Sequence, residues 1–219
     1  MVTFTYDEIK ARHHFYVALM FDDGYLSQYN IAKYLARIGI RATFFITTHI
    51  REQPWLASSP EMIVDISNFG HEIGSHTCTH PNLLLLSRDE LEHEIKESKK
   101  YLEHLLEREV HAFAYPFMLC NKEIIRVVHK YYKISRGGEY LYIGSRKINA
   151  YRVSSSIESL LKKLLKNELK SFKIVIHNEN PLRIKLLASL LKTCPFIRFV
   201  TISELASILV KSESTNNDH

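Results

Sequence analysis

Two histidines four positions apart and a pair of adjacent aspartates are the residues whose types and spacing favour metal chemistry in this sequence. His76 and His80 lie in a polar segment, and Asp22 and Asp23 lie well before them in the chain. Two imidazole nitrogens and a carboxylate oxygen form a ligand set that zinc accepts. Three protein ligands leave one coordination position for water or a substrate oxygen, so the pattern indicates a catalytic metal site.

The aspartates can share one site only if a strand ends at them, because successive residues of a strand point to opposite faces. Gly24 permits the turn that this requires. One carboxylate would then bind the metal while the other acts as a general base. For Asp22, Asp23 and Gly24 alone, a loop that caps a helix N-terminus is the favoured alternative.

The histidine pair is predicted to lie on a short, loop-like turn, because Pro81 disfavours helical geometry at His80. A third histidine, His177, follows an apolar β-branched run and is expected to emerge at the mouth of a strand. There it could donate a proton to a leaving group, although a histidine that merely ends a strand fits equally well. The others are interpreted as surface or core residues: His13, His14, His49, His71, His93, His104, His111 and His129.

Apolar runs alternate with helical patterns along the chain, which predicts a mostly parallel sheet covered by helices. The predicted strands are Phe15–Phe21, Ala42–Thr47, Glu72–Ser75, Ala112–Tyr115, Lys133–Ser135, Tyr151–Val153, Phe172–Ile176 and Ile197–Val200. The predicted helices are Tyr25–Ile38, Pro60–Gly70, Arg88–Arg108, Lys122–Tyr131, Ile157–Leu169, Leu182–Lys192 and Ser203–Val210. Seven or eight strands fit a β/α barrel.

The candidate site residues agree with that architecture, since each directly follows a predicted strand. They are Asp22, Asp23, His76, Pro116 and His177. Barrels carry their sites at the carboxyl ends of the strands, but a doubly wound open sheet does the same, so location does not decide between the two folds.

Length and composition predict one domain over residues 1–210 and a flexible polar tail over 211–219. No apolar run is long enough to span a membrane and the N-terminus lacks the apolar segment of a signal peptide, so a cytoplasmic protein is expected. The net charge of +5 is spread thinly, and no nucleic-acid partner is expected. The oligomeric state is not predicted.

Several segments together resemble the polysaccharide deacetylase (NodB-homology) family, which is carbohydrate esterase family four. Met20–Gly24 resembles the family's Thr-Phe-Asp-Asp-Gly motif, and His76–His80 resembles its His-Ser/Thr-x-x-His motif. Weaker similarity is found at Phe113–Phe117, Val175–His177 and Phe199–Leu205, in the family's order.

This resemblance implies a distorted (β/α) barrel and a metal-dependent hydrolase that removes N-acetyl or O-acetyl groups from sugars. By it, Asp23, His76 and His80 hold the metal, usually zinc and sometimes cobalt, nickel or iron. Asp22 would be the base and His177 the acid.

The resemblance also implies that Tyr115, Pro116 and Phe117 contact the substrate, with a backbone N–H near Phe117 stabilising the oxyanion. The family's third motif often begins with an arginine that orients the base.

The chain departs from the family at this arginine, whose place is taken by Ala114, a loss that some relatives share. Arg146 and Arg152 are therefore the candidates for that charge. The family's Asp-rich fourth motif, which would supply the partner of His177, has no counterpart.

Three other functions compete with sugar deacetylation. A small-amide amidohydrolase would use the same chemistry. A non-catalytic glycan-binding relative could have kept the metal, but it would have no use for Asp22. A nucleic-acid binder would need basic and aromatic residues interleaved on one face.

Overall fold

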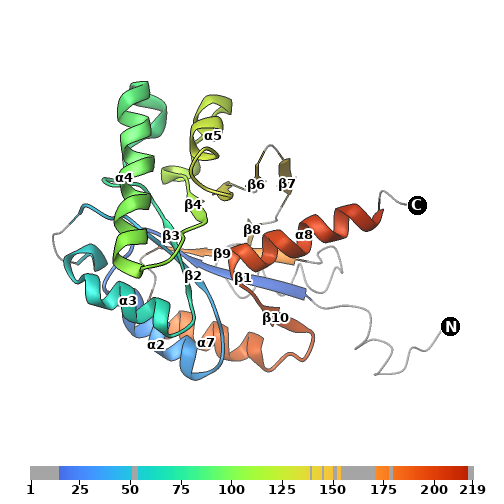
Figure 1. Ribbon diagram of the computed structural model, residues 1–219. Coiled ribbons are helices and arrows are strands. Elements are labelled where there is room, and N and C mark those ends of the chain that lie inside the picture. The colour runs from blue at the N-terminus through green and yellow to red at the C-terminus, as the bar shows by residue number, and fades with distance from the viewer. Residues whose placement is uncertain are drawn as a thin grey trace.

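The computed structural model describes residues 15–50, 54–138, 140–144, 146–149, 152–153, 171–177 and 180–216. Within these ranges ten strands form one sheet in the order β7-β6-β5-β4-β3-β2-β1-β9-β8, with β10 also paired to β1 (Figure 1). The strands are β1 (Phe15–Phe21), β2 (Thr43–Ile46), β3 (Glu72–Ser75), β4 (Ala112–Ala114), β5 (Ile134–Gly137), β6 (Tyr140–Ile143), β7 (Arg146–Asn149), β8 (Arg152–Val153), β9 (Ser171–Ile176) and β10 (Ile197–Phe199). The α-helices are α2 (Ser27–Arg37), α3 (Pro60–Asn68), α4 (Arg88–Leu106), α5 (Lys122–Val128), α7 (Pro181–Lys192) and α8 (Ile202–Asn216).

The central strand is β1, and it has parallel partners on both edges. β9 pairs with it along Tyr16–Phe21. On the other edge β10 pairs with Phe15–Val17, and β2 pairs with Met20–Phe21. Among the described residues the sheet curls without pairing β7 to β8, so it is a half-barrel. The prediction of a distorted, mostly parallel β/α barrel is confirmed.

Both faces of the sheet are buried. Val17, Leu19 and Phe21 of β1 face a core that includes residues of α2, α3, α4, α5 and α7. Ala18 and Met20 face a second core closed by α8, which lies across the opposite face (Figure 1). Burial on two faces explains why the strands read as continuous apolar runs instead of alternating ones.

Local sequence signals set the ends of the elements that carry the site. The α4 helix begins with the predicted capping box, in which the Ser87 hydroxyl and the Glu90 carboxylate each accept a hydrogen bond from the other residue's backbone. In β3, a Cβ on Gly74 would lie 2.6 Å from the Phe45 ring, so only glycine allows β2 and β3 to approach in this way.

Two features differ from the predictions. β6 and β7 add an antiparallel hairpin to the parallel sheet, and Gly144 in its short loop has a φ of 57°. The α8 helix continues to Asn216 instead of ending at Val210, because the polar residues that follow contain no glycine or proline to stop it. The predicted helix Ile157–Leu169 lies outside the described residues.

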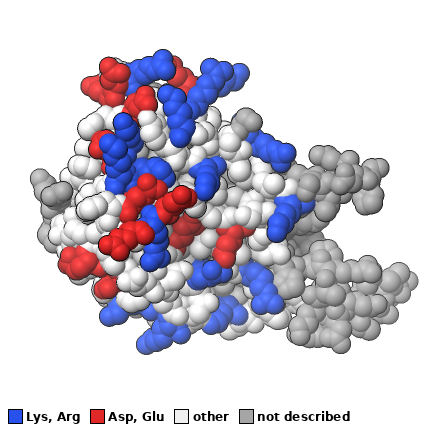
Figure 2. Space-filling model, viewed as in Figure 1, with Lys and Arg blue, Asp and Glu red and all other residues white. Residues whose placement is uncertain are grey.

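The surface of the described region carries mixed charge. Figure 2 shows acidic and basic side chains interleaved on the viewed face, without a large area of one sign. The α4 helix contributes two such pairs, Lys99 with Glu103 and Lys100 with Glu97. None of the described helices has the length and apolar character that a membrane span would require.

Candidate metal centre and catalytic site

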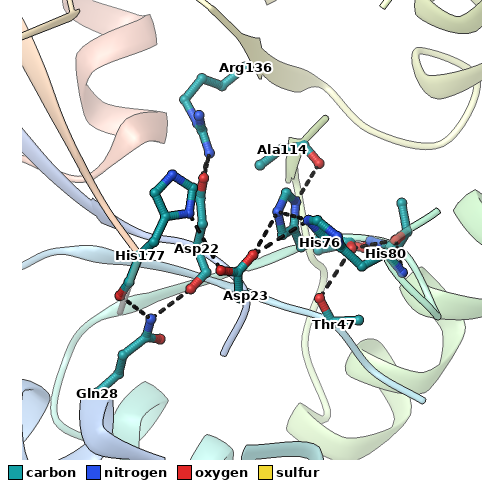
Figure 3. Close-up of polar contacts among 11 residues, drawn as sticks. Asp22, Asp23, Gln28, Thr47, His76, His80, Ala114, Arg136 and His177 are labelled. Carbon is teal, nitrogen blue, oxygen red and sulfur yellow. Dashed lines mark hydrogen bonds and ion pairs between the residues drawn. The ribbon is translucent and has the colours of Figure 1, made fainter. Parts of the chain in front are cut away.

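The predicted site residues meet at the carboxyl ends of neighbouring strands (Figure 3). Asp22 and Asp23 follow β1, His76 follows β3 and His177 follows β9. The chain turns sharply after β1, with φ of 74° at Asp23 and 84° at Gly24. As expected from Gly24, this turn breaks the strand alternation and lets both aspartates face one site, although they contact different partners.

Asp23 and the two predicted histidine ligands form one cluster. The Asp23 Oδ1 atom lies 3.5 Å from His76 Nε2 and 3.4 Å from His80 Nε2. The two Nε2 atoms are 3.1 Å apart. For ligand atoms about 2.0–2.2 Å from a tetrahedral ion, mutual separations of roughly 3.3–3.6 Å follow from geometry. The three side chains are therefore arranged as metal ligands would be.

The orientation of the His76 ring supports this assignment. Its Nδ1 lies 2.8 Å from the carbonyl oxygen of Ala114. A carbonyl only accepts, so Nδ1 donates this hydrogen bond and Nε2 is the ring nitrogen directed toward Asp23 and His80. Nε2 is therefore the nitrogen that His76 can offer to a metal ion, and with Asp23 Oδ1 and His80 Nε2 it completes a nitrogen and oxygen donor set that fits a divalent ion.

Electrostatics keep the other two ligands in metal-binding form. Burial raises the pKa of Asp23, but its interactions with His177 and then His76 outweigh this, and the net pKa lies well below the usual range. Burial, reinforced by the nearby His76, lowers the pKa of His80. An ionised carboxylate and a neutral imidazole are the forms that bind metal.

The second aspartate, Asp22, is held by a buried arginine. The Nη2 atom of Arg136 donates to both carboxylate oxygens of Asp22, at 2.5 Å from Oδ2. Both side chains are almost fully buried, at 0% and 2% exposure. The guanidinium also lies 5.2 Å from the centre of the Phe45 ring. This carboxylate is fixed in orientation and is not one of the clustered metal ligands.

The arginine beside Asp22 is not one of those predicted. Arg146 lies exposed on β7, two strands away from β5, and the side chain of Arg152 is outside the described part. Arg136 is instead the cross-strand partner of Ala114, the position at which the family often has its arginine. The guanidinium thus comes from the neighbouring strand and reaches the same carboxylate.

Sequence reasoning missed Arg136 because it ended the strand at Ser135. The signal was a charged residue at the end of an apolar strand, directly before Gly137 and Gly138. A buried arginine requires an acidic partner, and Asp22 required a basic one, a role that the predictions gave to Arg146 and Arg152.

His177 lies on the opposite side of Asp23 from the other imidazoles. Its Nδ1 is 3.4 Å from Asp23 Oδ2, and its side chain is 46% exposed. The hydrogen bond to Asp23 raises the pKa of His177 against the opposing effect of burial. Gln28, which was not predicted, donates through Nε2 to the carbonyl oxygens of Asp22 at 2.6 Å and His177 at 3.3 Å. It therefore ties the ends of β1 and β9 together.

The segment after β4 matches the predicted substrate contacts only in part. Tyr115 is fully buried and its hydroxyl pairs with Ser135 Oγ at 2.8 Å, so its side chain belongs to the core. Pro116 is also buried. Phe117 is 60% exposed with φ of 54°, and its ring centroid lies 4.7 Å from that of His80 in a T-shaped arrangement. Among the described residues its N–H has no acceptor, as an oxyanion donor requires.

Comparisons with known proteins agree with this geometry. Residues 10–132 match the family model described as polysaccharide deacetylase. A peptidoglycan-N-acetylglucosamine deacetylase of Bacillus cereus is 35% identical over 91 residues, which is 41% of this chain and only 31% of that protein. A chitooligosaccharide deacetylase of Azorhizobium caulinodans is 29% identical over 169 residues, covering 75% of this chain and 74% of the relative.

A solved structure of a peptidoglycan N-acetylglucosamine deacetylase shares the fold. It superposes with a TM-score of 0.66 at 21% identity, covering 89% of this chain and 93% of the other. The family model covers more than half of the 219 residues and includes both metal-site motifs. The chain therefore belongs to the polysaccharide deacetylase family.

Proposed function

We propose that this protein is a metal-dependent deacetylase that hydrolyses the acetamido group of N-acetylated sugars. The observation that carries the proposal is the placement of two carboxylates with separate partners at one strand edge. Asp23 faces His76 and His80, while Asp22 is held apart by Arg136. That division provides a ligand set and a separate base, as hydrolysis at a metal requires.

Asp23, His76 and His80 would hold a divalent ion, for which zinc is the first candidate and cobalt, nickel and ferrous iron are alternatives. When bound, the ion supplies Lewis-acid polarisation of the acetyl carbonyl and makes water acidic enough to attack near neutral pH.

The remaining steps fall to side chains and backbone of this chain. Asp22 accepts the proton of the attacking water, and Arg136 keeps its carboxylate aimed during the transfer. The free N–H of Phe117 donates to the oxyanion that forms on the acetyl carbonyl. As the carbon–nitrogen bond breaks, His177 gives its proton to the departing amine.

The relatives support the substrate class. The two curated relatives are described as deacetylases of peptidoglycan N-acetylglucosamine and of chitooligosaccharides. Peptidoglycan and chitooligosaccharides are both polymers or oligomers that carry acetamido groups. We propose the same class of substrate for this protein. Free or carrier-linked precursors of N-acetylated sugars carry the same acetamido group and are therefore candidate substrates as well.

The test is acetate release by metal-stripped protein before and after addition of zinc or cobalt. The substrates are chitin oligosaccharides, peptidoglycan fragments, N-acetylated nucleotide sugars and a panel of small non-sugar amides. The variants are Asp22→Asn and His76→Ala. Asp89→Asn and His104→Ala serve as matched controls, since both residues are exposed on α4.

We expect metal-restored acetate release from a sugar that is lost in both site variants and kept in both controls. Metal binding that depends on His76 without acetate from any sugar would contradict the proposal. Cleavage of a non-sugar amide would then favour an amidohydrolase, and sugar binding without cleavage would favour a non-catalytic relative.

A further inference from the structure

A buried carboxylate from α4 lies beneath the turn that carries the two histidine ligands. Glu94 is 8% exposed, and its Oε2 accepts hydrogen bonds from the backbone N–H groups of Cys78 at 2.8 Å and Thr79 at 2.9 Å. Its Oε1 accepts from the Thr79 hydroxyl at 2.7 Å. These three bonds all fall between His76 and His80.

The turn needs such support because its backbone is unusual. Thr77 has a φ of 71° and His80 a φ of 60°, conformations that cost free energy in residues with a Cβ. Buried N–H groups are also costly when they have no acceptor. Glu94 satisfies the N–H of the buried Cys78 and also accepts from the N–H of its exposed neighbour Thr79, so it favours this conformation over the alternatives open to the segment.

A second set of contacts fixes the ends of the same turn. The Thr77 hydroxyl accepts from the His80 N–H at 3.0 Å and donates to the carbonyl oxygen of His76 at 2.5 Å. Thr77 thus links the two ligand residues to each other. Glu94 links the middle of the turn to a rigid helix. The backbone N–H groups of Thr48 and His49 hold the same turn from the segment after β2, donating to the carbonyl oxygens of Thr77 at 3.1 Å and Cys78 at 2.9 Å.

We propose that Glu94 is a positioning residue for the metal centre, setting through the 76–80 turn the separation of the two histidine Nε2 atoms. This inference rests on the proposed metal-dependent function. It assigns to Glu94 no contact with metal or substrate, since its carboxylate oxygens are taken up by Cys78 and Thr79. Residues that orient metal ligands in this way commonly change metal affinity by about 10-fold to 100-fold when removed.

The experiment compares Glu94→Ala and Glu94→Gln with the wild type. An amide oxygen can accept both backbone N–H groups while its NH2 donates to the Thr79 hydroxyl, so glutamine preserves the pattern. Glu97→Ala is the matched control, because Glu97 lies one turn along α4 and pairs with Lys100 at the surface. Zinc affinity is measured by competition with a chromophoric chelator, and coordination geometry by the visible absorption of bound cobalt.

We expect zinc binding about 10-fold to 100-fold weaker in Glu94→Ala with an altered cobalt spectrum, and binding within about 3-fold of wild type in Glu94→Gln. Glu97→Ala is expected to match the wild type in both measurements. If Glu94→Ala does not fold, Glu94→Asp replaces it, since it withdraws the oxygens by one methylene while keeping the charge.

Unchanged zinc affinity and cobalt spectrum in a Glu94→Ala protein whose melting temperature falls would overturn the proposal, because the residue would then be merely structural. A loss in Glu94→Gln as large as in Glu94→Ala would also overturn the account based on hydrogen bonds. Wild-type protein that binds neither zinc nor cobalt would refute the metal-dependent function itself, and with it the role of Glu94.

Discussion

Arg136 binds both carboxylate oxygens of Asp22 through a single nitrogen, although the two residues are separated by 114 positions in the chain. The pair lies in the interior, where a charged group without a partner costs several kcal/mol. The arginine therefore stabilises the fold and aims the proposed catalytic base by the same contact.

Removing this arginine should damage both stability and activity. We expect Arg136→Met to lower the free energy of unfolding by about 3–5 kcal/mol, because it leaves the Asp22 carboxylate buried and unpaired. Loss of an oriented general base should lower kcat/KM for acetate release on the order of 100-fold or more. Urea unfolding and acetate assays measure the two effects.

Arg146→Met is the control for this change, since Arg146 is exposed on β7. The double variant Asp22→Asn/Arg136→Met should be less destabilised than the sum of the single variants, because the two residues form one interaction. Strict additivity would show that the pair is not coupled.

Metal should stabilise the folded protein through the histidine ligands. With free zinc at 100 times its dissociation constant, the free energy of unfolding should rise by about 2.7 kcal/mol. Thermal unfolding with and without zinc measures this. His76→Ala should lose the effect and His104→Ala should keep it. Equal stabilisation of both variants would place the bound zinc elsewhere.

Gln28 should matter for catalysis more than for metal binding, because its two hydrogen bonds go to the backbone of Asp22 and His177, the proposed base and acid. Gln28→Met keeps the length of the side chain but removes the donor. We expect a loss of about 1–3 kcal/mol in stability and a lower kcat. Zinc affinity should stay close to that of the wild type.

Asn30→Ala, an exposed change on the same helix, is the control for Gln28. Wild-type kcat in Gln28→Met would show that the two strand ends hold their positions without this amide.

His71 should make stability depend on pH. Its Nδ1 accepts from the Ala42 N–H at 3.1 Å, so its Nε2 carries the proton and donates to the Ala32 carbonyl at 3.0 Å. Burial lowers the pKa of His71, against the opposing effect of the Ala32 hydrogen bond. The unfolded chain, with a histidine pKa of about 6.5, binds the proton first as the pH falls. Stability should therefore be complete above about pH 6.5 and decrease below it, by at most about 1.4 kcal/mol per pH unit.

His71→Gln removes this titration and keeps a donor and an acceptor. Urea unfolding between pH 7.5 and 5 should give a smaller pH slope for His71→Gln than for the wild type, and an unchanged slope for the exposed control His104→Gln. Equal slopes in all three proteins would mean that His71 is not the titrating group.

The cluster of candidate metal ligands could be predicted from sequence because its chemistry is local. His76 and His80 lie within one turn, and Asp23 directly follows a recognisable buried strand. The parallel sheet could also be predicted from local sequence. Strands that are buried on both faces leave continuous apolar runs in the chain.

The contacts that orient these residues could not be predicted in the same way. Arg136, Glu94 and Gln28 reach the site from β5, α4 and α2, and their roles depend on how distant elements pack. The β6–β7 hairpin was a different kind of omission. Gly144 follows β6 directly with a φ of 57°, and a glycine of this conformation between two short strands is a recognised hairpin signal.

The cross-strand register of Ala114 and Arg136 has a consequence for how such proteins are recognised and how they diverge. An arginine at position 114 beside Arg136 would bring two like charges into one buried space, so one position must stay small when the other carries the guanidinium. We expect the two positions to covary among relatives, with arginine on one strand or on the other. A search that demands arginine in the third motif would discard members whose base is fully supported from the adjacent strand.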